Sequence, residues 1–374
     1  MLRVIVLLLS LWGWSLPIAP AQPTTTNSSE AALLKIRAAR HLPALATVVV
    51  KDGLICDRTA VGLRKIDDPS PITTQDLFHI GSCTKSMTAT LVAMFVEQGT
   101  LRWDSTIAEI FPELRGQINA AYEPVTIEQL LQHRAGLSTR PPAAAWAALR
   151  TSRQPLPQQR RDFLRAVLQQ KPEAAPGTKM IYSNQGYVVA GAMLEKLTGQ
   201  SWEQLITEKL FRPLHLDTAG FGPPETVGQV SQPWGHLRNA DGVHPSQEDN
   251  PPALGPAGTV HCSLDDLARF VIAHLDGENG GGILSSHTFK RLHTPPTGGD
   301  YAAGWGVARR TWAGGVALTH QGSNTFWFVV MWLAPKKHFA VIAATNIAGP
   351  EAERGCDEAV QAMIQQWLSA PRAF

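Results

Sequence analysis

A serine and a lysine three residues apart suggest the chemistry that this sequence could perform. Ser82 and Lys85 lie in the stretch 78–87 (FHIGSCTKSM), which runs into an apolar segment ending near Phe95 that predicts a buried helix. Gly81 allows a tight turn at the helix start, where backbone N–H groups lack partners within the helix. Residues three apart share one helix face, so the lysine amine can reach the serine hydroxyl. A desolvated, neutral lysine could then take the serine proton and make Ser82 a nucleophile.

This spacing alone is weak evidence for catalysis. A serine three residues before a lysine is expected about once by chance in a chain of this length at average composition. A serine at a helix start usually only caps the helix. The catalytic interpretation therefore depends on the rest of the chain.

Length and composition indicate a large folded protein. The chain has 374 residues, of which 44% are hydrophobic, so it can bury a sizeable core as one large domain or two lobes. Its formal net charge is +2, and the charges are mixed along the sequence without a basic stripe, which argues against nucleic-acid binding. No P-loop, H-E-x-x-H or dinucleotide motif is present, so we expect neither a metal nor an organic cofactor.

The first 21 residues read as an export signal. Arg3 supplies the positive charge, 4–18 the apolar core, and 19–21 (APA) a small-x-small cleavage site, so the mature chain is expected to begin near Gln22. An uncleaved membrane anchor fits less well because the apolar run is short and contains Pro17. We therefore expect a periplasmic or secreted protein without a stable membrane span.

Export would carry four cysteines into an oxidising compartment. Their irregular spacing without C-x-x-C does not fit a metal site, and it leaves both disulfides and separate buried thiols open. Cys83, beside Ser82, is most simply a buried helix residue. The four are Cys56, Cys83, Cys262 and Cys356.

The elements that must position these residues form two groups. Two β-rich runs, 44–50 and 54–61, are joined by a turn signal at 51–53 and predict an antiparallel hairpin. Strands return near the C-terminus, and helices with Pro-rich connections lie between. This order predicts an α/β (α+β) fold: an antiparallel sheet flanked by helices and built from both termini, with an inserted, mainly helical lobe and a cleft between them.

Within the mature domain 22–374, the α/β lobe is predicted at about 30–81 and 258–374 and the helical lobe at about 82–257. The stretch 233–256 predicts a long loop. Thr126 is expected to cap a short helix that ends at Gly136. The later strands are expected at 304–307, 316–319, 326–333 and 339–344, and further helices at 30–40, 160–170, 185–197, from 201, 263–275 and 351–367.

Two further motifs strengthen the first. Tyr182 and Asn184 stand as Y-x-N on a turn before a predicted helix, and His320, Gly322 and Ser323 lie at the end of a predicted strand. The three motifs in this order resemble the serine β-lactamase and penicillin-binding protein superfamily, most closely its class C β-lactamase, D-alanyl-D-alanine carboxypeptidase and esterase branch. Supporting stretches at 130–137, 185–222, 258–270 and 304–306 extend the resemblance over nearly the whole mature chain.

The resemblance implies a role for each catalytic residue. Ser82 would be the acylated nucleophile and Lys85 its base or the helper of its base. Tyr182 would shuttle the proton between the serine, the leaving group and the deacylating water. Because a phenol titrates near 10 when unperturbed, this role is expected to need nearby cations, for which Lys85 and His320 are the candidates.

The resemblance also implies how a substrate would be held. Asn184 would orient the substrate's amide or ester and hold Lys85. The backbone N–H groups of Ser82 and Ser323 would form the oxyanion hole, and Gly322 would let the substrate approach the strand closely.

Two positions depart from the commoner pattern of the superfamily. His320 replaces a lysine, which fits the carboxypeptidase and esterase side better than most true β-lactamases. Gln321 replaces a small hydroxyl residue, which weakens recognition of a substrate carboxylate.

Each residue also has an ordinary structural explanation. Tyr182 alone could be a buried tyrosine, Asn184 a helix cap and His320 a satisfied histidine at a strand end. His133, in the stretch 130–137, is expected to be structural and to pack a loop beside the cleft.

Together the motifs predict an exported serine hydrolase that cleaves an amide or ester through an acyl-enzyme, most like a D-alanyl-D-alanine carboxypeptidase or an esterase. Its partner would be a small-molecule or peptide substrate: an acyl-D-amino acid, an ester or a β-lactam. A class C β-lactamase, a non-catalytic penicillin-binding sensor and a scaffold without chemistry are the alternatives.

Overall fold

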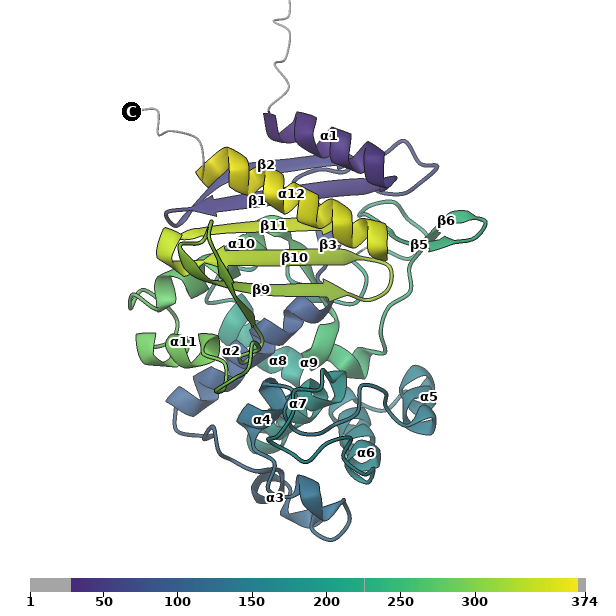
Figure 1. Ribbon diagram of the computed structural model, residues 1–374. Coiled ribbons are helices and arrows are strands. Elements are labelled where there is room, and N and C mark those ends of the chain that lie inside the picture. Colours follow the sequence, from purple (N-terminus) through teal and green to yellow (C-terminus); the bar gives the residue numbers. More distant parts are fainter. Residues whose placement is uncertain (1–27, 225, 369–374) are drawn as a thin grey trace, which may run out of the picture.

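The computed structural model describes residues 28–224 and 226–368, so the predicted export signal at 1–21 lies outside the described residues. A six-stranded antiparallel sheet dominates one part of the molecule (Figure 1). Its first two strands come from the N-terminal part of the chain and the other four from the C-terminal part, as predicted. In spatial order the strands are β2 (Leu54–Gly62), β1 (Ala44–Lys51), β11 (Phe339–Thr345), β10 (Phe328–Ala334), β9 (Gly315–Ser323) and β8 (Gly306–Arg310).

Helices cover both faces of this sheet. Figure 1 shows the first and last helices, purple and yellow, side by side across one face, and these two helices contact each other. A third helix packs against the opposite face, on β1, β10 and β11. The layers therefore run helix, sheet, helix. The helices of this part are α1 (Ser28–Arg40), α12 (Pro350–Leu368), α10 (Leu264–Gly277) and α11 (Ser286–His293).

The predicted hairpin of β1 and β2 is present. Asp52 and Gly53 both have positive φ, at 52° and 78°, as a two-residue turn between twisted strands requires. Seven of the eight residues of β1 are buried, because β1 lies inside the sheet with helices on both faces. β2 lies at the sheet edge and alternates between buried and exposed positions. Local turn chemistry and apolar patterning are thus sufficient to define this hairpin.

Side-chain alternation on β10 separates two hydrophobic clusters. Phe328 and Val330 point into the cluster under α1 and α12. Val329 and Met331 point into the larger cluster, which continues into the helical part of the molecule. Because this larger core is continuous, it couples the sheet to the helices that carry the nucleophile.

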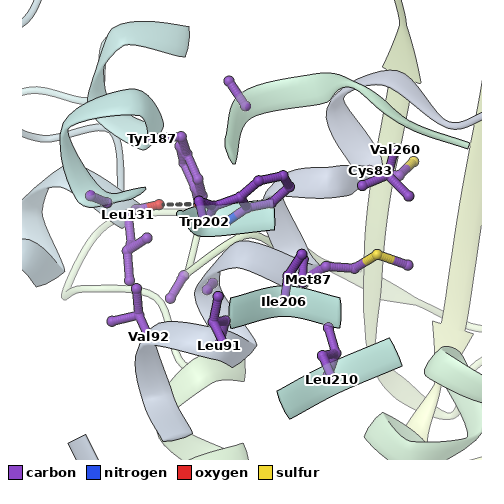
Figure 2. Packing of buried hydrophobic residues seen from close by; sticks show 14 of the residues in the cluster. Cys83, Met87, Leu91, Val92, Leu131, Tyr187, Trp202, Ile206, Leu210 and Val260 are labelled. Carbon is purple, nitrogen blue, oxygen red and sulfur yellow. Dashed lines mark hydrogen bonds between the residues drawn. The ribbon is translucent and has the colours of Figure 1, made fainter. Parts of the chain in front are cut away.

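The helical part is organised around α2, whose first twelve residues are all buried. Figure 2 shows Met87 and Leu91 of α2 packed near Trp202 and Ile206, with Tyr187 beside them. Truncating Leu91 to alanine is expected to cost about 2–5 kcal/mol of stability. The elements are η1 (Gly81–Cys83), α2 (Thr84–Glu97), α3 (Ile107–Ile110), η2 (Pro112–Leu114), η3 (Ala120–Tyr122), α4 (Ile127–Leu131), α5 (Ala143–Thr151), α6 (Leu156–Leu168), α7 (Asn184–Thr198), α8 (Trp202–Ile206), η4 (Thr207–Phe211), η5 (Pro252–Leu254) and α9 (Gly255–Gly258).

The structure corrects two expectations. The stretch 233–256 is not simply a long loop, because it holds a β-hairpin, η5 and the start of α9. The helix capped by Thr126 has the predicted capping box but ends at Leu131, before Gly136, because the chain turns at His133 with φ of 57°. Short strands missed by the sequence pattern are β3 (Leu77–His79), β4 (Gly220–Phe221) and β7 (Val260–Ser263) in a small sheet, and the hairpin β5 (Gly235–Asn239) and β6 (Gly242–Ser246).

Within the described ranges, no helix combines the length and the apolar character needed to cross a membrane.

Candidate active site

The nucleophile turn lies between β3 and α2. Gly81 has φ of 49°, and a methyl group added to it would lie 2.3 Å from the backbone nitrogen of Ser323. Only glycine fits this position, because both the left-handed backbone and the close approach exclude a side chain. Ser82 follows, half-buried, at the wall of a cavity of about 560 Å³.

Lys85 is fully buried beside this serine. Its Nζ lies 3.0 Å from Ser82 Oγ, 2.7 Å from Asn184 Oδ1 and 2.6 Å from the carbonyl oxygen of Ala257. Among the described residues it forms no ion pair with a carboxylate, and burial lowers its pKa to about 7. A neutral amine can donate to Asn184 and Ala257 and offer its lone pair to the serine proton.

Tyr182 completes the contact around the nucleophile. Its hydroxyl hydrogen-bonds with Ser82, and Lys85 Nζ lies 4.9 Å from the centre of its ring. Burial raises the pKa of Tyr182 above its usual value, and this effect exceeds the lowering by the serine hydrogen bond. The expectation that nearby cations lower this pKa is therefore wrong. Tyr182 is a neutral hydroxyl that can accept one proton while it donates another.

The imidazole of His320 is also neutral. Its Nδ1 lies 2.7 Å from the carbonyl oxygen of Gln321 and its Nε2 2.9 Å from the hydroxyl of Tyr301. Since a carbonyl only accepts, Nδ1 holds the proton and Nε2 accepts from Tyr301. Burial lowers the pKa of His320 to about 3, with Lys85 adding to the effect. Tyr301 was not predicted as a site residue, although it lies just before the stretch 304–306 that the sequence did single out.

The edge of β9 lies open beside the nucleophile. β8 pairs with β9 only from Gly315 to Thr319, and no other strand of the described residues lies beside 320–323 on that side. A methyl group on Gly322 would lie 2.6 Å from Ser82 N and 2.0 Å from the carbonyl oxygen of Ile80. The nucleophile turn and the end of β9 are therefore in backbone contact, and this contact brings Ser82 and Ser323 together.

His133 packs directly against the tyrosine. Its Nδ1 accepts the backbone N–H of Ser183 at 3.1 Å, and its ring centre lies 4.3 Å from that of Tyr182. Burial holds its pKa well below the ordinary histidine value. Asn184 is the first residue of α7, exposed, while Ser183 occupies the cap position, so Asn184 does not act as the cap.

A second cavity of about 290 Å³ shares Asn184 with the site. Its wall is mainly apolar and comes from α5, α6, α7 and η5. The apolar side chains include Trp146, Phe163, Val188 and Leu254.

The cysteines are all free thiols, and only Cys56 is exposed. Cys83 lies buried behind the nucleophile, with Sγ 3.6 Å from the carbonyl oxygen of His320, and burial raises its thiol pKa. In the part of the chain that the structure describes, no group of three or more His, Cys, Asp or Glu side chains could hold a metal ion.

This sheet and helical insert, with serine, lysine, tyrosine and asparagine around one turn, define the class of serine β-lactamases and penicillin-binding proteins. The chain belongs to the Beta-lactamase family, whose model matches residues 30–364. The predicted resemblance to the serine β-lactamase and penicillin-binding protein superfamily, in its class C β-lactamase and D-alanyl-D-alanine carboxypeptidase branch, is thereby confirmed.

Two curated relatives illustrate the range of the family. Penicillin-binding protein 4 of Amycolatopsis lactamdurans is 28% identical over 323 residues, which cover 83% of this chain and 82% of that protein. Unguisins hydrolase ungD' of Aspergillus campestris is 26% identical over 325 residues, covering 82% of this chain but only 59% of that protein.

Solved structures confirm the fold. The octameric penicillin-binding protein homologue from Pyrococcus abyssi aligns with a TM-score of 0.74 at 24% identity, covering 91% of this chain and 78% of that one. The crystal structure of SurE aligns with a TM-score of 0.74 at 22% identity, covering 93% of this chain and 77% of that one.

Proposed function

We propose that the chain is an exported serine hydrolase that cleaves an amide or ester through an acyl-enzyme on Ser82, with esterase-like or D-alanyl-D-alanine carboxypeptidase-like activity. One observation carries this proposal: the amine of Lys85 lies 3.0 Å from Ser82 Oγ and has a pKa lowered to about 7. The lysine is therefore available as a base near neutral pH.

Acylation would begin when Lys85 takes the proton of Ser82 and Oγ bonds to the substrate carbonyl carbon. The backbone N–H groups of Ser82 and Ser323 would stabilise the resulting oxyanion. When the bond to the leaving group breaks, Tyr182 would pass its proton to that group and recover one from the lysine ammonium. A water molecule would then cleave the acyl-enzyme by the reverse proton path, releasing the acid and free Ser82.

The open edge of β9 supports a substrate with an extended peptide-like backbone, which can pair with a free strand edge. The neighbouring 290 Å³ cavity supports an apolar substituent on that substrate.

The charges around the larger cavity support the esterase-like side. Among the described residues that line it there is no lysine or arginine, whereas Glu353 and Asp357 are present. His320, at the position where a lysine is commoner, is neutral. A substrate carboxylate would therefore meet no fixed positive charge there, which favours neutral esters and amides over β-lactams and free C-termini.

The relatives support the coarser part of the proposal. One curated relative is named a hydrolase, which favours turnover over a non-catalytic sensor, and another is named a penicillin-binding protein. The signal pattern at 1–21 supports a periplasmic or secreted location.

The test compares the mature protein with Ser82→Ala, using Ser231→Ala at an exposed serine as the matched control. We expect Ser82→Ala to abolish p-nitrophenyl acetate hydrolysis while Ser231→Ala keeps it. Hydrolysis retained by a clean Ser82→Ala preparation would contradict the acyl-enzyme.

A substrate pair then tests the charge preference. An acyl-D-alanyl-D-alanine peptide and its C-terminal amide differ only in the carboxylate, and we expect a higher kcat/KM for the amide. Preference for the acid would indicate a carboxypeptidase. A stable penicillin adduct seen by intact-protein mass spectrometry, without turnover of any substrate, would indicate a sensor.

A further inference from the structure

A buried chain of three side chains connects the two turns that carry the oxyanion-hole N–H groups. His79 Nε2 lies 3.1 Å from Asp249 Oδ2, and Asn324 Nδ2 donates to Asp249 Oδ1 at 2.8 Å. His79 is fully buried, the side chain of Asp249 is 8% exposed, and the residue Asn324 is 4% exposed. These residues lie 170 and 75 positions apart in the chain, so only the fold brings them together.

On one side, His79 fixes the nucleophile turn. Its Nδ1 accepts the backbone N–H of Gly81 at 3.1 Å. Because a backbone N–H only donates, Nδ1 carries no proton, and the ring proton is on Nε2, where it is donated to Asp249. The carboxylate thus selects the tautomer that holds Gly81, whose left-handed conformation directs the next N–H, that of Ser82.

On the other side, Asn324 fixes the turn after β9. It directly follows Ser323, and its Oδ1 accepts the backbone N–H of Phe326 at 3.2 Å. Thr325 between them has φ of 80°, a conformation that a β-branched residue rarely adopts. Such a turn persists only where its surroundings hold it, and the Asp249 hydrogen bond is part of that support.

The segment that carries Asp249 also supports the nucleophile turn from a second direction. Asn250 Nδ2 donates to the carbonyl oxygen of Gly258 at 3.0 Å. A methyl group on Gly258 would lie 3.3 Å from the carbonyl carbon of Gly81 and 3.5 Å from Ser82 N. The segment around Asp249 therefore packs against the nucleophile turn.

We infer that Asp249 and His79 are positioning residues for acyl transfer, which hold the N–H groups of Ser82 and Ser323 in one geometry by bridging their turns. This inference rests on the proposed function, since it assumes an oxyanion in the reaction. Oxyanion donors act by being fixed before charge develops, and losing one such donor costs about 10²–10³ in kcat. When a donor N–H is only less firmly held, the loss of kcat should be smaller than when the donor is removed.

The first test is Asp249→Asn, with kcat and KM measured on p-nitrophenyl acetate. The asparagine amide has the shape of the aspartate carboxylate. It has only one acceptor oxygen for the two donors, His79 Nε2–H and Asn324 Nδ2–H, so one of the two hydrogen bonds is lost. We expect kcat to fall about 10–100-fold with KM within about threefold, because both acylation and deacylation pass through an oxyanion.

Asp266→Asn is the matched control. Asp266 is more deeply buried than Asp249, with its side chain 2% against 8% exposed, and it is hydrogen-bonded to Thr218 and Arg269, but it does not contact either turn. We expect this control to lose stability in urea unfolding while its kcat stays near the wild-type value.

A pair of His79 variants separates positioning from bulk packing. In His79→Asn, the amide oxygen can accept the N–H two residues on, as asparagine does in Asx turns, although the hydrogen bond to Asp249 is lost, so kcat should fall less than in His79→Leu. His79→Leu fills the space without an acceptor and should lose as much kcat as Asp249→Asn. This pair decides the question if Asp249→Asn does not fold.

Wild-type kcat in Asp249→Asn, or equal kcat losses in both His79 variants, would overturn the inference while the proposed function stands. Absence of turnover in the wild-type protein would instead contradict the proposed function, and the inference with it.

Discussion

Two cationic side chains are completely buried in the described part of the chain, and their surroundings are opposite. Arg160 on α6 forms ion pairs with Glu195 and Glu203, and its Nε donates to the carbonyl oxygen of Ala253 at 3.0 Å. Lys85 on α2 hydrogen-bonds to three neutral oxygen atoms and lies beside the rings of Tyr182 and Tyr187, with no carboxylate partner among the described residues. One cation is fully compensated by carboxylates, and the other is not.

The difference follows from what each side chain can do with its proton. An arginine cannot lose its proton in a protein, so its burial requires counter-charges. A lysine can lose its proton. The pKa of Lys85 falls from 10.5 to about 7, which corresponds to about 5 kcal/mol in favour of the neutral form. Burial without a counter-charge therefore makes Lys85 a base, whereas burial with two carboxylates makes Arg160 a structural cation.

The two cations also hold opposite ends of one short segment. Arg160 binds the carbonyl of Ala253, and Lys85 binds that of Ala257. Arg160 thus helps to position the segment that carries the carbonyl of Ala257, to which the amine of Lys85 donates. Four experiments test this division between a reactive and a structural cation.

Lys85→Arg should give the largest effect. Arginine keeps the charge and the donors but cannot accept the serine proton, so the acylation rate should fall about 10²–10⁴-fold. The measurement is the burst of p-nitrophenol in stopped flow. Lys35→Arg, at an exposed position on α1, should leave the burst unchanged. A near-normal burst in Lys85→Arg would show that Lys85 is not the base.

Arg160→Met should act on stability instead. It leaves one buried carboxylate, Glu195, and one partly buried carboxylate, Glu203, without their partner, so the free energy of unfolding should fall by about 3–5 kcal/mol. Urea unfolding measures this, and kcat per folded molecule should change only a few-fold. Arg40 also pairs with two carboxylates, Glu351 and Glu358, but near the surface, where solvent screens the pairs, so Arg40→Met should lose much less stability than Arg160→Met. Equal losses in both variants would contradict the distinction drawn from burial.

The pH dependence should give the smallest effect. The active form of Lys85 is the deprotonated one, so the acylation rate should rise about tenfold from pH 6 to 8, with an apparent pKa of about 7, and then level off. His320, with its pKa lowered to about 3, should add no ionisation in this range. A rate that keeps rising above pH 9 would point to a Tyr182 phenolate as the base, since burial raises the pKa of that phenol.

The lowered pKa of Lys85 also predicts how the free energy of unfolding depends on pH. The lysine pKa is lower in the folded than in the unfolded chain, so the unfolded chain binds more protons between about pH 7 and 10.5. The contribution of Lys85 to stability is therefore present above this window and lost as the pH falls through about 7. Lys85→Met should remove this pH dependence from urea unfolding.

Local signals were enough to predict much of the fold. The β1–β2 hairpin, the capping boxes at Thr126 and Ser201 and the cap at Ser263 all depend on residues within a few positions of one another. The sheet order and the hairpin in 233–256 were harder, because short strands acquire their pairing from distant segments.

The sequence by itself determined which residues could meet at the site: Ser82 and Lys85 through helical spacing, and Tyr182, Asn184, His320 and Gly322 through motif order. Only the tertiary structure decided their chemical states. The fold buries Lys85 and His320 without a carboxylate counter-charge, which lowers both pKa values, and burial raises the pKa of Tyr182 so that it keeps its proton. The bridge from His79 through Asp249 to Asn324 was likewise invisible in the sequence, because its members lie far apart along the chain and meet only once the sheet and the helical insert have packed together.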